Sequence, residues 1–259
     1  MPRYEVFVPA APPVLPGDAT LHVEGDHWLG ALREGLTRIG GGRPPANVLC
    51  DVQADGSIHV TDCASGRVFR IREVVAAPSA PGPAGPIGRP AAALRTEDVL
   101  AEVYARASAA KGRGRREGLA FLLDLALEHA ACEAGTLFLL TAGGDQLAFE
   151  VVRGPRAAEI ARLGITVPVG VGIAGFCARE GVCVAVSEAA RDPRHAREVA
   201  KAIQYEARSL LCAPIARPGR VLGVLEVLNK RGGAPFRPTD VAVVSYLAHQ
   251  AAALLERAA

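Results

Sequence analysis

Three glycines, Gly170, Gly172 and Gly175, form the pattern G-x-G-x-x-G directly after a predicted strand. This spacing is typical of a loop that holds the pyrophosphate of a dinucleotide, where a full helix must follow the third glycine. Here only residues 176–181 separate Gly175 from the next predicted strand. That length is too short for a crossover of about ten residues or more between parallel strands. We therefore predict a glycine turn with a short helix and no dinucleotide site.

The cysteines and histidines could supply nucleophiles or metal ligands, but their spacing does not indicate such a site. None of the six cysteines forms a C-x-x-C pair. Cys50 and Cys63 fall on neighbouring predicted strands and could share a face, but only His59 is near, and two thiolates alone make no zinc site. Neither G-x-S-x-G, H-E-x-x-H nor a phosphate loop occurs. We expect no catalytic residue, no metal, no cofactor and no disulfide, with the cysteines as small core residues.

The elements that position these residues fall into two groups, separated by a proline-rich stretch. Residues 76–93 read AAPSAPGPAGPIGRPAAA, a composition that buries little apolar surface and is typical of a linker. We expect a small α+β module in residues 1–75, the linker in residues 76–94 and a larger domain in residues 95–259. Because the linker offers few groups for a shared core, the two folded parts are predicted to be separate domains.

The N-terminal module is predicted to be a helix lying across a β-meander. Asp26 is the expected N-cap of a helix with Trp28 and Leu32 on its apolar face. The dipeptide Asp55-Gly56 predicts a two-residue hairpin turn that pairs residue 50 with residue 61. The strands of the module are expected at residues 4–8, 20–24, 48–53, 57–62 and 67–73.

The C-terminal domain is predicted to be a central sheet with helices at both of its chain ends, which makes the whole chain α+β. A basic, glycine-containing run, Lys111–Arg116, reads as a solvated turn between its first two helices. The strands are expected at residues 136–141, 147–153, 165–169, 182–186, 209–215 and 221–228. The helices are expected from residue 96, around residues 119–127, and at residues 157–162, 170–179, 193–205 and 239–257.

The composition excludes several classes of protein. The 259 residues are 50% hydrophobic and 22% charged, and 29 Lys and Arg against 27 Asp and Glu leave a formal net charge of +2. This balance gives no overall electrostatic reason to bind nucleic acid or an anionic membrane. No apolar run is long enough for a transmembrane helix, and the first residues lack the layout of a signal peptide. We expect a cytoplasmic protein with no nucleic acid and no membrane among its partners.

Three segments of the C-terminal domain resemble a GAF domain. They read GIAG at residues 172–175, LCAPI at residues 211–215 and LGVLEVLNK at residues 222–230. The resemblance covers about residues 96–258 and is closest to the regulatory GAF domains of cyclic-nucleotide phosphodiesterases and adenylyl cyclases. It implies a GAF-type central antiparallel sheet flanked by helices. The N-terminal module shows no comparable resemblance.

A signature of those regulatory domains, N-K…F-x-x-x-D-E, also occurs in part. Asn229, Lys230, Phe236 and Asp240 follow in that order, and Val241 replaces the final Glu. In the family, the Lys and the Asp of this signature form a structural ion pair beside the pocket. The resemblance therefore implies that Lys230 and Asp240 stabilise the fold and do not contact a ligand.

The resemblance also implies where a ligand would bind. In members that bind cyclic nucleotides, the backbone of the I-A pair in the glycine turn meets the ligand, and an acid on the last strand corresponds to Glu226. Helix N-terminal amides favour an anion, which agrees with that position. Arg153 and Ala207 stand where the family has an acid and a hydroxyl, which argues against the known mode of cyclic GMP recognition. The candidate ligand contacts are Gly172, Ile173, Ala174, Gly175, Arg194, His195, Tyr205, Arg208 and Glu226.

We therefore expect a non-catalytic signalling protein whose GAF domain senses a small anionic ligand, with a nucleotide as one candidate. Its output would be contact with an effector protein of unknown identity. One alternative is a dimerisation or interaction module without a ligand, which a pocket closed by Phe138, Phe149 or Phe176 would favour. A less favoured alternative is the sulfoxide-reductase branch of the family, which has a cysteine inside the glycine turn where this chain has Ala174.

A homodimer through the terminal helices is also expected. Apolar residues recur at spacings of three and four along the last helix, as in a seam between helices. The alternative is that this stripe belongs to the core of the monomer. The residues of the stripe are Val241, Val244, Ala248, Ala251 and Leu255.

Overall fold

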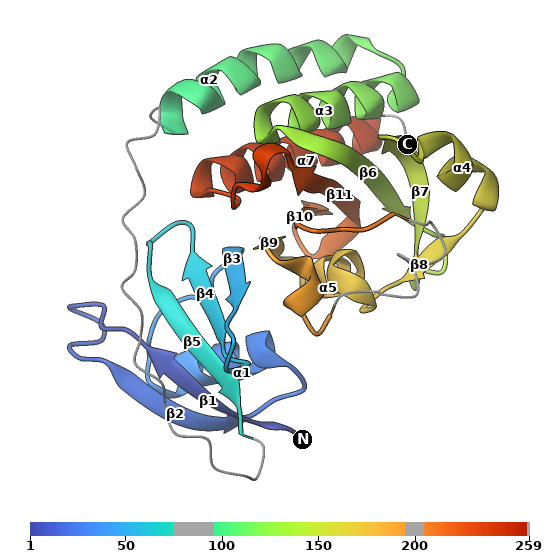
Figure 1. Ribbon diagram of the computed structural model, residues 1–259. Coiled ribbons are helices and arrows are strands. Elements are labelled where there is room, and N and C mark those ends of the chain that lie inside the picture. Colours follow the sequence, from blue (N-terminus) through green and yellow to red (C-terminus); the bar gives the residue numbers. More distant parts are fainter. Residues whose placement is uncertain (75–95, 195–204, 258–259) are drawn as a thin grey trace.

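The computed structural model describes residues 1–74, 96–194 and 205–257 (Figure 1). In this part of the chain all strands join one sheet, in the order β2-β1-β5-β4-β3-β9-β10-β11-β6-β7-β8. Neighbouring strands are antiparallel except for β3 and β9, which run parallel. The predicted α+β class and the predicted GAF-type antiparallel sheet are therefore confirmed. The parallel pair of β3 and β9, which was not predicted, joins this sheet to the strands of the N-terminal module.

The elements agree in most places with the predicted ones. The strands are β1 (Arg3–Val8), β2 (Ala19–Glu24), β3 (Asn47–Val52), β4 (Ile58–Asp62), β5 (Val68–Glu73), β6 (Cys132–Leu140), β7 (Gln146–Arg153), β8 (Thr166–Pro168), β9 (Cys183–Val186), β10 (Leu210–Arg217) and β11 (Arg220–Lys230). The helices are α1 (Trp28–Arg38), α2 (Thr96–Ala107), α3 (Arg115–Ala130), α4 (Ala157–Leu163), α5 (Gly172–Glu180) and α7 (Pro238–Arg257), with short 3₁₀ turns at Ser108–Gly112, Ala189–Arg191 and Arg231–Gly233. The helix predicted at residues 193–205 lies mostly outside the described residues.

Two local predictions in the N-terminal module are wrong by one residue. The N-cap of α1 is His27 and not Asp26, because the Nδ1 atom of His27 accepts a hydrogen bond from the Gly30 amide at 3.2 Å. The β3–β4 loop has three residues, closed by the Gln53 amide that donates to the Ser57 carbonyl at 2.8 Å. The longer loop pairs Cys50 with Val60 and not with residue 61.

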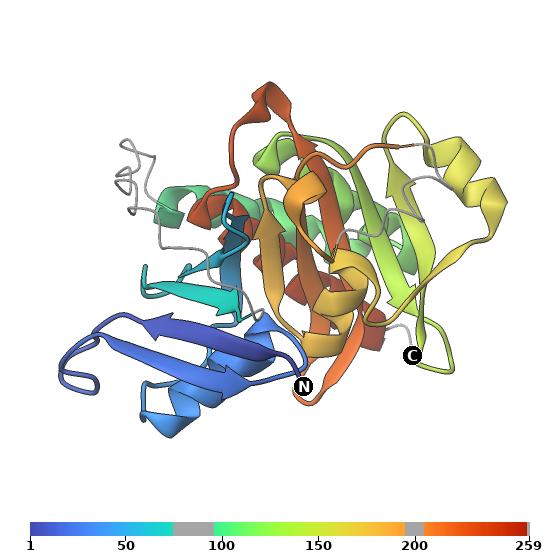
Figure 2. The ribbon, with the colours of Figure 1, turned by 60° about the horizontal axis from the view of Figure 1, so that its bottom comes forward.

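Helices cover both faces of the sheet (Figures 1 and 2). Helices α2, α3 and α7 pack on one face, and α1 and α5 pack on the other. Strand β9 shows the division, because Val184 and Val186 belong to the core under α1 and α5, whereas Cys183 and Ala185 belong to the core under α3 and α7. The two thiols whose arrangement was left open, Cys50 and Cys63, also lie toward different cores, so they do not share a face.

The N-terminal module and the C-terminal domain are joined, so the prediction of separate cores is wrong. The parallel pairing runs from Asn47 opposite Cys183 to Cys50 opposite Val186. A single apolar core contains residues of β1, α1 and β3 together with residues of α5, β9 and β10. The proline-rich stretch gave no sign of this junction, since the contact forms between segments far apart in the sequence.

The stripe predicted as a dimer seam on α7 lies inside the monomer. Val241, Val244, Ala248 and Ala251 are fully buried, and only Leu255 is partly exposed. Helix α7 packs against α3 and β10, so these residues have their partners within the chain. None of the described helices has the length and apolarity needed to cross a lipid bilayer.

Candidate functional site

A cavity of about 90 Å³ lies between the sheet and the helices α4 and α5. This volume is several times the roughly 10–15 Å³ that one water molecule requires, so the cavity has room for a small organic molecule. Most of its lining is apolar. The lining residues are Ala134, Thr136, Phe138, Phe149, Val152, Arg153, Pro155, Arg156, Ala157, Ile160, Val167, Val171, Gly172, Ile173, Ala174, Tyr205, Ala207, Leu210, Glu226 and Leu228.

The floor of the cavity carries a polar row across three strands. Glu226 on β11 lies opposite Cys212 on β10 and opposite Thr136 on β6. Residues directly opposite one another in antiparallel strands project from the same face, so the three side chains are neighbours. The Cys212 thiol donates to the Oε1 atom of Glu226 at 3.4 Å. Glu226 and Thr136 both line the cavity, and together they offer an acid and a hydroxyl at the bottom of an apolar pocket.

The environment of Glu226 opposes its ionisation. Burial raises the pKa of this carboxyl to about 7, and the hydrogen bond from Cys212 only partly opposes the change. Glu226 as a whole residue is half-buried, and it lines the cavity. Near neutral pH both the neutral and the charged form are therefore populated. Glu226 can accept a hydrogen bond in either form and can donate one when protonated.

The N-terminal end of α5 forms one wall. Gly172, Ile173 and Ala174 line the cavity, and the N-cap residue Val171 has no side chain that could bind the first amides. The first amides of a helix have no carbonyl partner within it, and they carry a partial positive charge. Gly175 has a structural role. A Cβ at this position would lie only 2.5 Å from the Pro168 carbonyl oxygen, so a larger residue would clash there. It allows α5 to pack on the preceding turn and does not line the cavity.

Three polar residues predicted near the ligand have different positions. Tyr205 lines the cavity, and its hydroxyl accepts a hydrogen bond from the Nδ2 atom of Asn229 at 3.0 Å. Arg208 is exposed and pairs with Glu133 at 2.9 Å, outside the cavity. Arg194 is also outside the cavity. His195 lies outside the described residues, so its position as a contact stays a prediction.

Arg194 lies at the junction between the C-terminal domain and the N-terminal module. Its side chain pairs with Asp192 at 2.6 Å, and its guanidinium lies over the rings of Phe176 and Trp28, at 4.6 and 5.2 Å from their centroids. Spacing along the chain could not distinguish this position from one in the cavity. The aromatic partner Trp28 belongs to the N-terminal module, which the sequence indicated to be separate.

Two arginines at the rim were not predicted as contacts. Arg153 ends β7 and binds Asp124 at 2.7 Å, and Arg156 binds Glu159 at 2.6 Å. Both line the cavity, together with the intervening Pro155. The signal in the sequence was the run Arg153-Gly154-Pro155-Arg156 between a strand and a helix, which places two guanidinium groups on one turn. Each guanidinium is paired with a carboxylate, so the two arginines add hydrogen-bond donors, and not net charge, to the rim beside the end of α5.

The signature residues stabilise the end of β11. Lys230 and Asp240 form a buried ion pair, and the Lys230 ammonium lies 5.5 Å from the centroid of the Phe236 ring. Asn229 has a left-handed backbone with φ of +56°. Its Oδ1 atom accepts from the Arg208 amide at 2.8 Å, and its Nδ2 atom donates to the Glu206 carbonyl at 2.9 Å. The ion pair implied by the family resemblance is thus present, and it does not line the cavity.

The sequence profile of the GAF domain matches residues 116–255, more than half of the chain, so the chain belongs to the GAF domain family. The match begins within α3 and leaves the N-terminal module and α2 outside it. It confirms the family that the GIAG turn and the Asn229-Lys230 pair indicated.

Among curated proteins the chain is similar to cyclic-nucleotide phosphodiesterases over a short stretch. It is 35% identical over 77 residues to the dual 3',5'-cyclic-AMP and -GMP phosphodiesterase 11A of Takifugu rubripes, which is 29% of this chain and 8% of that protein. It is 39% identical over 77 residues to the dual phosphodiesterase 11 of Drosophila melanogaster, which is 29% of this chain and 5% of that protein. The matched region thus spans less than a tenth of these relatives.

Solved structures show the same fold. The GAF domain of a phosphoenolpyruvate-protein phosphotransferase from Coxiella burnetii has a TM-score of 0.54 at 18% identity, covering 63% of this chain and 94% of that one. The free methionine-R-sulfoxide reductase of Neisseria meningitidis has a TM-score of 0.51 at 20% identity, covering 64% of this chain and 93% of that one. Identities this low show the GAF fold alone.

Proposed function

We propose that this protein is a non-catalytic regulatory protein whose GAF domain binds a small ligand in the cavity. The observation that carries the proposal is the arrangement of polar groups around an apolar pocket. Glu226 and Thr136 lie on the floor, the free amides of α5 form a wall, and two arginines lie at the rim. An apolar site with a few convergent polar groups is typical of small-molecule binding.

The arrangement favours a ligand with an apolar ring, an anionic group and a hydrogen-bonding edge. The ring would lie against Phe138 and Phe149, whose centroids are 4.7 Å apart. The anionic group would bind the amides of Ile173 and Ala174, as helix N-termini bind anions. The polar edge would reach Glu226. Cyclic nucleotides have these features, and the names of the phosphodiesterase relatives support them as first candidates.

A non-catalytic role is supported by the state of the thiols. Burial raises the pKa of Cys50, Cys63, Cys132 and Cys183 to about 12, and raises those of Cys177 and Cys212 well above the usual range. Thiols of this kind are poor nucleophiles, because the thiolate is the reactive form. Ala174 occupies the position of the glycine-turn cysteine of the sulfoxide-reductase branch, which supports the same conclusion.

The principal alternative is an interaction module with no ligand. Phe138 and Phe149 narrow the cavity, which is the observation in its favour. A homodimer and an unidentified effector protein remain part of the proposal in either case. Since the α7 stripe is buried, a dimer through terminal helices would use the outer surface of α2, where Tyr104 is exposed.

Two measurements test the function. Mass spectrometry of small molecules released from the denatured, freshly purified protein identifies a ligand that co-purifies. Calorimetry with cyclic AMP, cyclic GMP and a set of anionic metabolites follows, on the wild type and on Glu226→Ala. Loss of one charge-assisted hydrogen bond, about 1.5–3 kcal/mol, would weaken binding about tenfold or more.

Arg208→Ala is the matched control, because this exposed arginine lies outside the cavity and should leave the affinity unchanged. No released molecule and no binding across the set would favour the interaction module. Equal loss of affinity in both variants would show that the ligand binds elsewhere.

A further inference from the structure

Helix α5 belongs to two contacts at once. Its first residues, Gly172–Ala174, line the cavity, whereas Phe176 and Glu180 on the same helix contact the N-terminal module. The helix has nine residues, and a hydrogen-bonded helix of that length is about 13 Å long and moves as one piece. A displacement at the cavity end therefore reaches the other end.

The first part of the contact is aromatic. The Phe176 ring is 2% exposed and stacks on Trp28, with centroids 5.8 Å apart and planes at 25°. The His27 ring forms a T-shaped pair with the same ring, with centroids 5.3 Å apart and planes at 81°. The Arg194 guanidinium, which Asp192 binds, lies over both Phe176 and Trp28.

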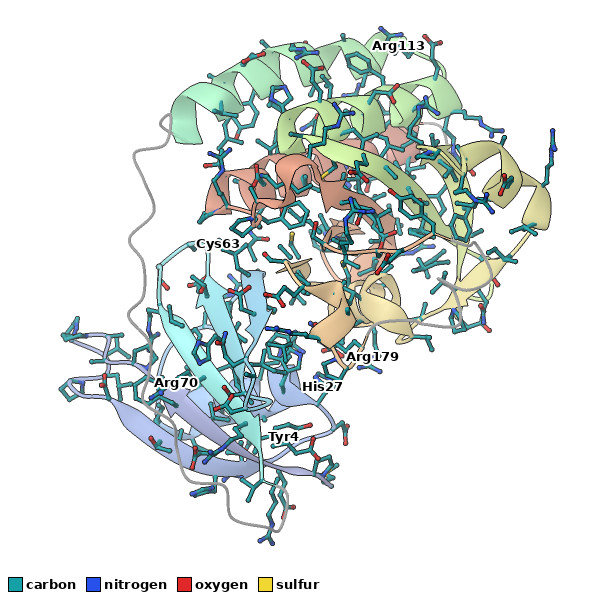
Figure 3. All side chains as sticks on the ribbon, in the orientation of Figure 1. Tyr4, His27, Cys63, Arg70, Arg113 and Arg179 are labelled. Carbon is teal, nitrogen blue, oxygen red and sulfur yellow. The ribbon has the colours of Figure 1, made fainter. Side chains whose placement is uncertain are left out.

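The second part is an ion-pair cluster around Glu180, at the C-terminal end of α5. The Glu180 carboxylate accepts from Arg33 at 2.7 Å and from Arg179 at 2.9 Å. The Nε2 atom of His27 lies 3.1 Å from the same carboxylate, and it carries the proton when Nδ1 accepts from the Gly30 amide. Figure 3 shows His27 and Arg179 beside each other at this junction.

In the part of the chain that the structure describes, the junction leaves a buried hydrogen-bond donor without a partner. Among the described residues, the buried Nε1 atom of Trp28 has no hydrogen-bond partner. Unpaired buried donors destabilise the arrangement that buries them. The contact therefore carries an energetic cost, which a rearrangement that exposes Trp28 to a hydrogen-bond partner would relieve.

We propose that the N-terminal module is the output element of the cavity: a ligand held at the first turn of α5 shifts this helix and changes the contact of Phe176 with Trp28 and Arg194. The inference rests on the proposed ligand-binding function. A ligand can act in this way only if it binds the two positions of α5 with different affinity. The amides of Ile173 and Ala174 are part of α5 itself, so the interaction with the ligand depends directly on where the helix lies.

The coupling can be tested without a ligand, because Trp28 is the only tryptophan in the chain. Thr136→Met fills the cavity from its floor, at a residue that belongs neither to α5 nor to the N-terminal module. Leu137→Met is the matched control, since Leu137 lies on the same strand and in the opposite core. The readouts are acrylamide quenching of Trp28 fluorescence and the single indole NMR signal.

We expect T136M to shift the indole signal and to raise the quenching constant about twofold or more, because a population shift toward the displaced position of α5 exposes the Trp28 ring. The control should match the wild type. Trp28 signals that are identical in all three folded proteins would overturn the proposal.

The reverse direction gives a second test, because coupling between two sites is reciprocal. Arg33→Met removes the Glu180 contact from the N-terminal side, and Arg38→Met removes an exposed pair with Glu34 on the same helix. We expect the backbone amide NMR signals of Ile173 and Ala174 to shift in R33M, because these groups move with α5, and to match the wild type in R38M. Unchanged signals in R33M would refute the coupling.

The coupling experiments and the ligand-binding experiments can fail independently of each other. Coupling without any bound metabolite would leave the N-terminal module as a partner of α5 and would remove the sensor function. Ligand binding without coupling would leave the sensor function in place and would refute only the output role of the module.

Discussion

Replacing Glu226 by glutamine is expected to stabilise the protein, and the gain should depend on pH. The pKa of this carboxyl rises from its ordinary value of 4.5 to about 7 in the folded state. Between these values the folded chain binds more protons than the unfolded chain, so the free energy of unfolding falls as the pH rises. The contribution of Glu226 to stability is fully present below about pH 4.5 and is lost as the pH rises through about 7.

The size of the change in unfolding free energy follows from the shift in the pKa of Glu226. At about 1.4 kcal/mol for each pKa unit, the full change corresponds to roughly 3 kcal/mol. Glu226 is only half-buried, so solvent screening reduces this value, and we expect roughly 2 kcal/mol. Glutamine keeps the shape and the acceptor for the Cys212 thiol but cannot ionise.

Urea denaturation at about pH 4 and about pH 8 measures the effect. Wild type and E226Q should have similar unfolding free energies at the lower pH, and the variant should be more stable at the higher one. Glu206→Gln is the control, since this side chain is exposed and does not line the cavity. A constant difference between wild type and E226Q at both pH values would refute the reasoning.

Three further predictions concern stability. Lys230→Met removes the buried ammonium partner of Asp240 and leaves this carboxylate with the Arg237 amide at 2.8 Å and the Arg237 guanidinium at 3.8 Å, so it should cost up to about 3–5 kcal/mol in chemical denaturation, and pairing it with Asp240→Leu should recover much of the loss. Asn229→Ala removes the side-chain hydrogen bonds at a backbone with φ of +56°, and it should be more destabilising than Asn229→Gly in a thermal melt, because glycine relieves the backbone strain. Ala251→Glu places a charge in the core under α7 and should unfold the monomer, whereas dissociation of a folded dimer would show that the stripe forms an interface after all.

Much of the fold could be predicted because the strands and helices carry local patterns. The apolar spacing around Trp28 identified α1, and the run ending in Asn229-Lys230 identified β11. The hairpin error arose because a turn with Gly56 at φ of +78° suits a three-residue loop as well as a two-residue one. A single extra residue then moved the register of β3 and β4 by one.

The junction between the modules could not be predicted from local patterns. Pairing of β3 with β9 is non-local, and a period of two residues does not identify the partner of a strand. One signal was present: all four residues of β9 are apolar and buried, which indicates a strand covered on both faces. For the site, strand alternation could not tell which face Glu226 takes, and it gave no indication that Arg194 binds Trp28.

The parallel junction has a practical consequence for dividing the chain. A fragment limited to the profile match would lack β3 and would leave β9 as an open edge, with four apolar residues and unpaired backbone groups. Such an edge is a template for pairing with other chains, and it promotes aggregation. Expression of the isolated GAF segment should therefore yield protein that aggregates, whereas the full chain covers that edge with β3 of its own N-terminal module. Whatever it transmits, the N-terminal module also protects the larger domain from self-association.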